Sequence, residues 1–202
     1  MNHWETVYSS KSADAVSWYQ AQATRSLAWI AASGLAHSAS IIDIGGGASN
    51  LVDDLLALGY SQLAVLDLSA AALAIVQQRL GEQSVTWRVG DVTELELSKN
   101  SIDLWHDRAV FHFLTQPEQR AAYRRILTTA IKPQGHVIIA TFADDGPKQC
   151  SGLPVMRYTA EQLAAELGDN FRLIKSERES HATPFGTQQA FIYCHFQRTA
   201  TL

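Results

Sequence analysis

The chain has 202 residues, of which 47% are hydrophobic and 18% are charged, which predicts a single globular domain with a sizeable core. Its net charge of −4 argues against nucleic acid as a partner, since phosphate-backbone binding normally needs a basic face. No stretch approaches the roughly 18–20 apolar residues that span a bilayer, and no basic-then-apolar leader opens the sequence. We therefore expect neither a membrane partner nor secretion.

The two cysteines, Cys150 and Cys194, show no metal-binding spacing. Two thiols are also too few for a four-ligand zinc site. We expect free thiols, a cytoplasmic location and no metal.

Residues 1–36 are expected to form an N-terminal helical lid rich in aromatic side chains. Helical periodicity is clearest over 25–35, and a second helix could open at 14–20. The aromatic residues before the first strand predict either a lid over a ligand or a helix packed on the sheet. Trp18 and Tyr19 are the lid candidates.

Strands and helices alternate over residues 37–142, the expected ligand-binding half. The predicted strands are 40–44, 63–66, 85–89, 102–105 and 136–142, and the predicted helices are 49–58, 69–80 and one opened by a capping-box pattern at 115–118. Such alternation is typical of an α/β fold with a mostly parallel sheet and right-handed crossovers.

Residues 143–202 carry a loop over 143–158, a helix over 159–167 and two strands at 171–176 and 190–197. No helical pattern separates the last two strands. They are therefore expected to pair as an antiparallel hairpin.

Three glycines, Gly45, Gly46 and Gly47, stand between the first predicted strand and a helix start. Such a turn brings backbone N–H groups and the positive end of the helix close to a ligand. Asp43, just before the turn, would repel a pyrophosphate, and Asn50 replaces the third glycine of the dinucleotide motif. The turn therefore predicts a ligand with a positive group, such as an amine or a sulfonium.

Two further acids follow the next strands. Asp67 is placed to accept hydrogen bonds from both hydroxyls of a ribose, and Asp91 from the exocyclic amine of adenine, with the Val92 N–H donating to the ring. Ligands of open α/β sheets bind at the carboxyl ends of the strands, so these groups are expected to meet in one site.

Five segments in this order resemble the class I S-adenosylmethionine-dependent methyltransferases of the type 11/12 group. They are the acid–glycine loop at 43–47, the ribose acid at 67–69, the adenine turn at 90–92, the fourth-strand motif at 103–108 and the approach to the fifth strand at 127–139. The resemblance covers residues 40–142. It implies a seven-stranded, mostly parallel Rossmann-like sheet with helices on both faces and an antiparallel C-terminal hairpin.

The resemblance also implies S-adenosyl-L-methionine as the cofactor. The residues that it assigns to cofactor binding, with a lid aromatic added, are Tyr19, Asp43, Gly45, Gly46, Gly47, Asp67, Leu68, Asp91, Val92 and His106.

The expected catalytic residues, Asp107, Arg108 and His112, follow strand 4, where the resemblance places the methyl group. The Asp-Arg-Ala string at 107–109 resembles thiol-directed methyltransferases, and Arg108 would favour a thiolate acceptor. For a lysine acceptor, Asp107 or His112 would help to keep the amine neutral, although His112 can also be read as structural. Residues 156–158 are expected near the acceptor.

Three functions stay open. The first is methyl transfer to a small molecule, possibly a thiol or another soft nucleophile. The second is methylation of a protein lysine or N-terminus. The third is a cofactor-binding module without transfer activity.

Overall fold

The computed structural model describes residues 3–10 and 12–199 of the chain; residues 1–2, 11 and 200–202, which the predicted single domain also includes, lie outside the description. Over the described part, seven strands form one sheet in the order β3-β2-β1-β4-β5-β9-β8. The strands are β1 (Ser40–Ile44), β2 (Gln62–Asp67), β3 (Val85–Val89), β4 (Ile102–Arg108), β5 (Ile131–Phe142), β8 (Phe171–Ala182) and β9 (Gln188–Arg198).

Strands β1 to β5 run parallel to one another, and β9 lies between β5 and β8 and runs antiparallel to both. This arrangement confirms the predicted α/β class and the predicted C-terminal hairpin.

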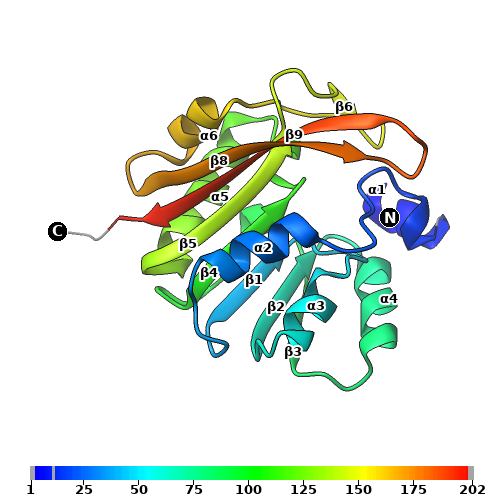
Figure 1. Cartoon of the computed structure of the whole chain (residues 1–202), viewed down its shortest axis with the longest axis horizontal. Helices are drawn as coiled ribbons and strands as arrows, with labels where there is room; N and C mark the ends of the chain where they lie inside the picture. Colours follow the sequence, from blue (N-terminus) through cyan, green and yellow to red (C-terminus); the bar gives the residue numbers. More distant parts are fainter. Residues whose placement is uncertain (1–2, 11, 200–202) are drawn as a thin grey trace.

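Helices cover both faces of the sheet (Figure 1). The helices are α1 (His3–Ser10), α2 (Thr24–Ala32), α3 (Leu51–Ala57), α4 (Ala70–Leu80), α5 (Pro117–Ala130) and α6 (Ala160–Leu167), with 3₁₀ turns η1 (Ala13–Ala15), η2 (Val92–Glu94) and η3 (Phe111–Phe113) and a two-stranded hairpin of β6 (Gln149–Cys150) and β7 (Leu153–Pro154). The core under α5 and α6 and the core under α2, α3 and α4 lie on opposite faces. None of the helices in the described chain is long and apolar enough to cross a membrane.

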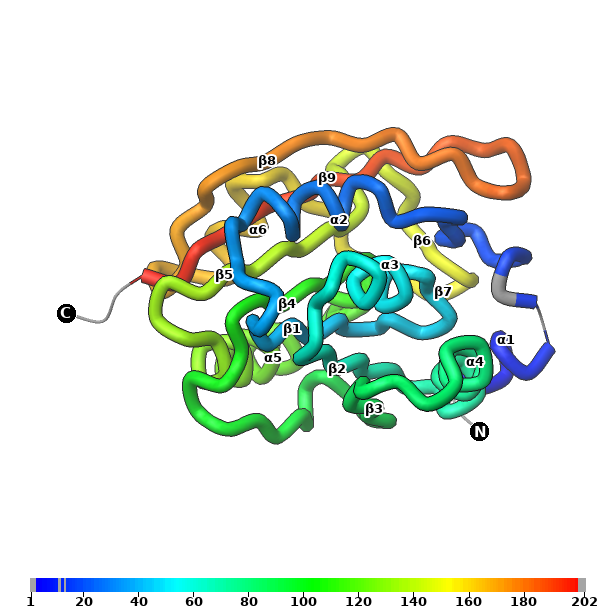
Figure 2. Tube along the Cα trace, turned by 60° about the horizontal axis from the view of Figure 1, so that its bottom comes forward, coloured from blue at the N-terminus to red at the C-terminus, as the bar shows by residue number. Residues whose placement is uncertain are grey.

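Helix α1 stands apart from both layers. In Figures 1 and 2 it lies beside α4, beyond the carboxyl ends of the first strands. Helix α2 instead packs on the sheet and buries Trp29 and Ile30. The two readings of the N-terminal segment therefore apply to different helices: one covers strand ends, and the other packs on the sheet.

Alternation along the strands decides which side chains can meet. Successive side chains of a strand point to opposite faces. The core on the α2 face of the sheet contains Ile41, Val65 and Leu104. The side chains two positions later, Asp43, Asp67 and His106, therefore point to the same face, and so does Arg108, two positions after His106. Asp107 shares the α5 face with its neighbour-but-one Trp105.

Several predicted boundaries move. Strand β4 runs to Arg108 and pairs there with Ala140, beyond the predicted end at Trp105. Strand β5 begins at Ile131, so the turn predicted at 132–135 lies inside the strand as an irregularity, with Gln134 at φ +65°. The last two strands are longer than predicted, and only residues 183–187 connect them.

The helix ends are set by local hydrogen bonds. Ser69 accepts from the Ala72 N–H at the start of α4, as expected for an N-cap. The capping box of α5 uses Gln116 and Gln119, one residue later than the predicted pattern. The prediction of a helix at 14–20 is wrong, since the helical structure there is limited to the end of the short turn η1.

Candidate active site

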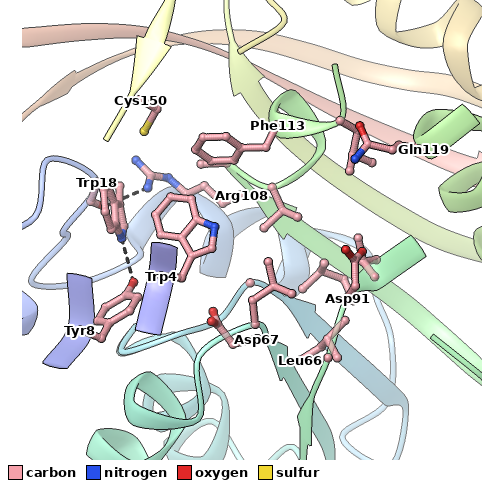
Figure 3. Close-up of a pocket in the computed structure, with 18 residues that line it drawn as sticks. Trp4, Tyr8, Trp18, Leu66, Asp67, Asp91, Arg108, Phe113, Gln119 and Cys150 are labelled. Atoms are coloured by element: carbon pink, nitrogen blue, oxygen red, sulfur yellow. Dashed lines mark hydrogen bonds between the residues drawn. The ribbon is translucent and has the colours of Figure 1, made fainter. Parts of the chain in front are cut away.

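A cavity of about 240 Å³ opens where the carboxyl ends of β1, β2 and β4 meet the turn after β3. We call it the larger cavity; its lining runs from the glycine loop and Asp67 to Asp91, Arg108 and Cys150 (Figure 3). A smaller cavity of about 60 Å³ adjoins it and includes Asp43, His106, Ser26 and Tyr19. Tyr8, Trp18, Gly45 and Arg108 line both cavities.

The glycine loop has no room for side chains. A Cβ on Gly45, which has φ +66°, would lie 2.1 Å from a methyl carbon of Val110. A Cβ on Gly47, at φ +47°, would lie 2.9 Å from Tyr8 Oη and 3.0 Å from Asp67 Oδ2. The loop is held against β2 because the Gly45 and Gly46 N–H groups both donate to the Leu66 carbonyl. Its backbone therefore stays close to whatever occupies the cavity.

Asp67 is 8% exposed at the end of β2. Its Oδ1 accepts the Ser69 N–H at 2.8 Å. Burial raises the pKa of Asp67 to about 6; the backbone hydrogen bond from Ser69 opposes the increase, and the nearby Asp43 carboxylate adds to it. A carboxylate that is destabilised in this way gains from ligand hydroxyls that donate to it.

Asp91 has two roles at the turn after β3. Its Oδ1 accepts from the Thr93 N–H and hydroxyl at 2.8 and 2.7 Å, which closes η2. It also lines the larger cavity beside Val92. The apolar walls that Leu66 and Leu68 add across this end suit a flat purine ring.

Asp43 and His106 lie on neighbouring strands in direct register. Asp43 Oδ1 is 2.7 Å from His106 Nδ1, and both side chains are buried. His106 Nε2 lies 2.9 Å from Ser26 Oγ of α2. With Tyr19, these groups make the wall of the smaller cavity.

Arg108 is held by neutral groups. Its Nε–H donates to Tyr193 Oη and one of its terminal nitrogens to the Trp18 carbonyl, both at 3.0 Å, and its guanidinium lies 4.6 Å from the Phe191 ring centre. Its other terminal nitrogen is buried without a hydrogen-bond partner. Within residues 3–10 and 12–199, no carboxylate forms an ion pair with Arg108. The site therefore contains an uncompensated positive charge.

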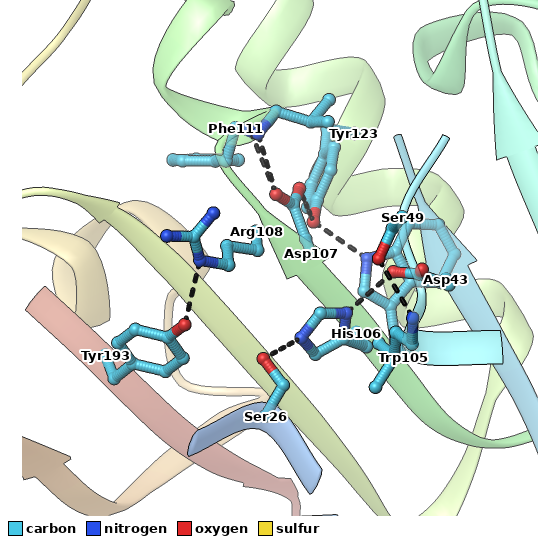
Figure 4. A network of polar contacts seen from close by, with 12 residues as sticks. Ser26, Asp43, Ser49, Trp105, His106, Asp107, Arg108, Phe111, Tyr123 and Tyr193 are labelled. Carbon is cyan, nitrogen blue, oxygen red and sulfur yellow. Dashed lines mark hydrogen bonds and ion pairs between the residues drawn. The ribbon is translucent and has the colours of Figure 1, made fainter. Parts of the chain in front are cut away.

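Asp107 lies on the other face of β4 and lines neither cavity. Its Oδ1 accepts the Val110 and Phe111 N–H groups, and its Oδ2 accepts the Tyr123 hydroxyl (Figure 4). Burial raises its pKa to about 6. These contacts shape the turn after β4, so the geometry gives the predicted catalytic role of Asp107 no support.

His112 is fully buried in the 3₁₀ turn η3 and lines neither cavity. Its Nδ1 accepts the Phe142 N–H, while its Nε2 has no partner. Burial lowers its pKa to about 3, and the charge of Arg108 adds to this effect. A neutral imidazole outside the cavity favours the structural reading of His112.

Aromatic residues from distant parts of the chain close the larger cavity. The Trp4 ring packs edge-to-face against Trp18 and Phe113, with centroid distances of 5.6 and 5.0 Å. The Trp18 indole N–H donates to Tyr8 Oη at 3.1 Å (Figure 3). Phe113 had no signal in the sequence, because only the fold brings η3 under α1.

Cys150 was predicted from the sequence to be a free thiol, but no site role was predicted for it. It lies in β6 and lines the larger cavity as a buried free thiol, whose pKa burial raises to about 11. The expected acceptor residues at 156–158 line neither cavity. The loop does reach the site, but through its hairpin.

Helix α1 is fixed at two points. Glu5 Oε2 accepts the Ser69 hydroxyl at 2.7 Å and the Ala71 N–H at 3.3 Å, at the start of α4. On the other side, His3 Nε2 lies 3.1 Å from Ser151 Oγ, in the β6–β7 turn. The helix thus bridges the two sides of the larger cavity.

Comparison with known proteins gives consistent results. Residues 41–135 match the family model of a methyltransferase domain. The chain is 32% identical over 107 residues to a malonyl-[acyl-carrier protein] O-methyltransferase of Anoxybacillus flavithermus, covering 52% of this chain and 39% of that protein. It is 25% identical over 159 residues to EEF1A lysine methyltransferase 2 of Danio rerio, covering 75% and 62%. The chain thus spans less than two thirds of either relative.

Among solved structures, one from work on the conversion of a disulfide bond into a thioacetal group during echinomycin biosynthesis has the same fold. It superposes with a TM-score of 0.79 and 17% identity, over 98% of this chain and 92% of that one. The family match over residues 41–135, together with solved S-adenosylmethionine-dependent methyltransferases that share the fold, supports assignment of the chain to the class I S-adenosylmethionine-dependent methyltransferases.

The residues present fit S-adenosylmethionine. The glycine loop lines both cavities through Gly45 and the smaller one through Gly46, so its backbone can lie against a ligand there, whereas Gly47 lines neither cavity and packs against Tyr8 and Asp67. Acceptor-only carboxylates at Asp67 and Asp91 match a ribose diol and an exocyclic amine, and the buried Asp43 matches the positively charged end of the ligand.

Proposed function

We propose that this chain transfers the methyl group of S-adenosylmethionine to a small-molecule acceptor with a soft nucleophile, such as a thiol. The observation that carries the proposal is the closure of the larger cavity by Trp4, Trp18 and Phe113. A covered aromatic compartment suits a small, partly apolar molecule. A protein acceptor would favour an open groove.

The bound cofactor supplies a methyl group that is already activated by the sulfonium. The protein then has to align the nucleophile behind the methyl carbon and exclude water. In the proposal, Asp67 and Asp91 hold the adenosine, the glycine loop and Asp43 hold the methionine end, and α1 covers both ligands.

Arg108 stabilises the nucleophile in its anionic form. An uncompensated guanidinium beside the cavity lowers the pKa of a bound thiol, and the thiolate is the reactive species. In the proposal, the carboxylates of the larger cavity, Asp67 and Asp91, are engaged with the cofactor, and the Cys150 thiol has a raised pKa, so we assign no residue as a base. The acceptor would therefore lose its proton to solvent before or during binding.

The second candidate function is methylation of a protein lysine. The similarity to a lysine methyltransferase, which extends over 75% of the chain, supports it.

An acceptor panel separates the two candidate functions. It contains aliphatic and aromatic thiols, a disulfide, carboxylic acids and lysine peptides, with release of S-adenosylhomocysteine as the readout.

We expect turnover with thiols and little with lysine peptides. Turnover confined to lysine peptides would establish the second candidate. Tight S-adenosylhomocysteine binding with no turnover on any acceptor would instead indicate a cofactor-binding module.

Arg108→Gln tests the role of the charge. We expect thiol turnover to fall at least tenfold, because removal of the positive charge raises the pKa of the bound thiol. Arg125→Gln, which removes an exposed arginine on α5, is the matched control and should leave turnover unchanged. Equal effects of the two variants would exclude the thiolate role.

A further inference from the structure

Two groups of buried polar contacts lie beside the cavities, and the cofactor motifs account for neither Ser26 nor Tyr193. In the first, Asp43 contacts His106, and His106 contacts Ser26, at 2.7 and 2.9 Å. In the second, Tyr193 Oη accepts the Arg108 Nε–H at 3.0 Å. Figure 4 shows these five residues, which we call the two buried polar groups, on β1, β4, α2 and β9.

Three side chains of these groups are almost fully buried. Ser26 and Tyr193 are 0% exposed and His106 is 2% exposed. Burying three polar side chains between two layers costs stability unless each donor finds an acceptor. Asp43, His106 and Ser26 line the smaller cavity, and Arg108 lines both cavities, which gives the arrangement a use beyond packing.

The chemistry of Arg108 and Asp43 fixes the direction of two of these hydrogen bonds. Arg108 can only donate, and the Asp43 carboxylate can only accept. Tyr193 Oη therefore accepts from Arg108, and His106 donates its Nδ1–H to Asp43.

We propose that Ser26, His106 and Tyr193 are positioning residues that fix Asp43 and Arg108 on opposite sides of the methyl-transfer position. Ser26 sets the ring orientation of His106 and, through it, the Asp43 carboxylate at the cofactor end. Tyr193 sets the plane of the Arg108 guanidinium at the acceptor end. The proposal rests on the proposed function for the identity of the two ligands.

Substitutions in the two buried polar groups should have different effects. Ser26→Ala removes the hydroxyl that contacts His106 and should weaken S-adenosylhomocysteine binding, measured by calorimetry, about tenfold. Tyr193→Phe leaves the Ser26–His106–Asp43 contacts in place, so affinity should stay within twofold. Turnover of the acceptor should nevertheless fall about tenfold in Tyr193→Phe, because Arg108 loses its fixed plane.

Tyr123→Phe is the matched control for loss of a buried hydroxyl. Tyr123 is also 0% exposed and bonded at 2.8 Å to two partners, Trp105 and Asp107, but on the opposite face of the sheet. It should lower the melting temperature about as much as Tyr193→Phe does, with unchanged S-adenosylhomocysteine affinity. The proposal is overturned if Ser26→Ala binds S-adenosylhomocysteine as wild type does, or if Tyr123→Phe weakens binding equally.

A measurement on the unsubstituted protein avoids any folding defect of the variants. Long-range ¹H–¹⁵N spectra report the tautomer of each histidine, and His106 should show Nδ1–H near neutral pH; the Nε2–H tautomer would overturn the proposal. Because cofactor affinity and the tautomer are both measured without an acceptor, a negative acceptor panel would refute the proposed function and leave this inference standing.

Discussion

Two buried acids of the site, Asp67 and Asp107, are perturbed in the same direction for the same reason. Burial raises the pKa of each to about 6. They differ in what surrounds them: Asp67 lines the larger cavity, whereas Asp107 is enclosed by Tyr123 and the turn after β4. We therefore expect the ionisation of Asp67 to affect ligand binding and the ionisation of Asp107 to affect the stability of the fold.

Asp67→Asn should abolish a pH dependence of cofactor binding. In the proposed role of Asp67, the ionised carboxylate accepts the ribose hydroxyls, so S-adenosylhomocysteine affinity should decline as the pH falls below about 6. The variant should bind at least tenfold more weakly at pH 7.5, with a flat profile between pH 5 and 7.5. Titration calorimetry at several pH values checks this, and a sloping profile in the variant would contradict it.

Asp107→Asn should flatten the pH dependence of stability. The folded-state pKa, about 6, is above the ordinary value of 3.8, so the folded protein binds the proton more tightly than the unfolded chain does. The resulting stability is full below about pH 4 and is lost as the pH rises through 6, by up to about 3 kcal/mol. Urea denaturation at pH 4.5 and 6.5 measures the difference. Asp169→Asn, an exposed acid, should leave that difference unchanged.

At this scale, the structure brings the predicted cofactor residues other than Gly47 to the two cavities, whereas Arg108 is the one predicted catalytic residue that lines them. Asp67, Asp91 and the glycines sit where parallel strands end, and strand ends meet by topology alone. Asp107 was grouped with Arg108 because they are adjacent, although alternation along an extended β4 sends them to opposite faces. The strand was predicted three residues too short, and this error hid the alternation.

Helix α1 is the element on which closure of the site depends. It buries little of its own surface, with Val7 as its one buried residue in the described chain. Its position comes instead from polar contacts of His3 and Glu5 on two sides of the helix and from packing of Trp4 against Trp18 and Phe113. Such an element can open without disturbing the sheet.

Glu5→Gln should speed cofactor release. The Glu5 carboxylate accepts from Ser69 and Ala71 at the positive end of α4, and the Ser69 hydrogen bond is the main reason that its pKa is lowered. Loss of the charge weakens this contact, so the dissociation rate of S-adenosylhomocysteine should rise about threefold. Stopped-flow tryptophan fluorescence measures it. Glu118→Gln, in the first turn of α5, is the control and should not change the rate.

The sequence predicted a helical lid over residues 1–36 but no separate helix at 3–10, and this omission has a physical cause. Residues 3–10 lack an apolar stripe, because their partners are strand ends and loops rather than a core. The aromatic content pointed to a lid, yet local patterns hold no information about which cavity a short helix covers.

For the whole molecule, the sheet and its two helical layers carry the stability. Leu127 of α5 is fully buried in the core that includes Trp105 and Tyr123. Leu127→Ala should lower the free energy of unfolding by about 2–5 kcal/mol, since it leaves a cavity. Leu58→Ala, at a position 48% exposed, should cost less than about 0.5 kcal/mol. Urea denaturation followed by circular dichroism compares the two, and equal losses would contradict this account of the core.

The overall architecture followed from the sequence because βα alternation and right-handed crossovers leave few topologies for the parallel part of the sheet. The C-terminal third was less predictable. The segment between the last two strands is rich in turn formers, yet most of it extends β8 and β9, since pairing to a neighbouring strand outweighs local propensity.

The double attachment of α1 has a kinetic consequence. Tyr8 of α1, and Trp18, which packs against α1, border both cavities. We therefore expect S-adenosylhomocysteine and the methylated product to leave through the same gap, which forms when α1 moves away. Opening is then expected to be the slow step of the cycle. A rapid-quench experiment should show a burst of one equivalent of product in the first turnover, followed by a slower steady rate. That rate should fall as solvent viscosity rises.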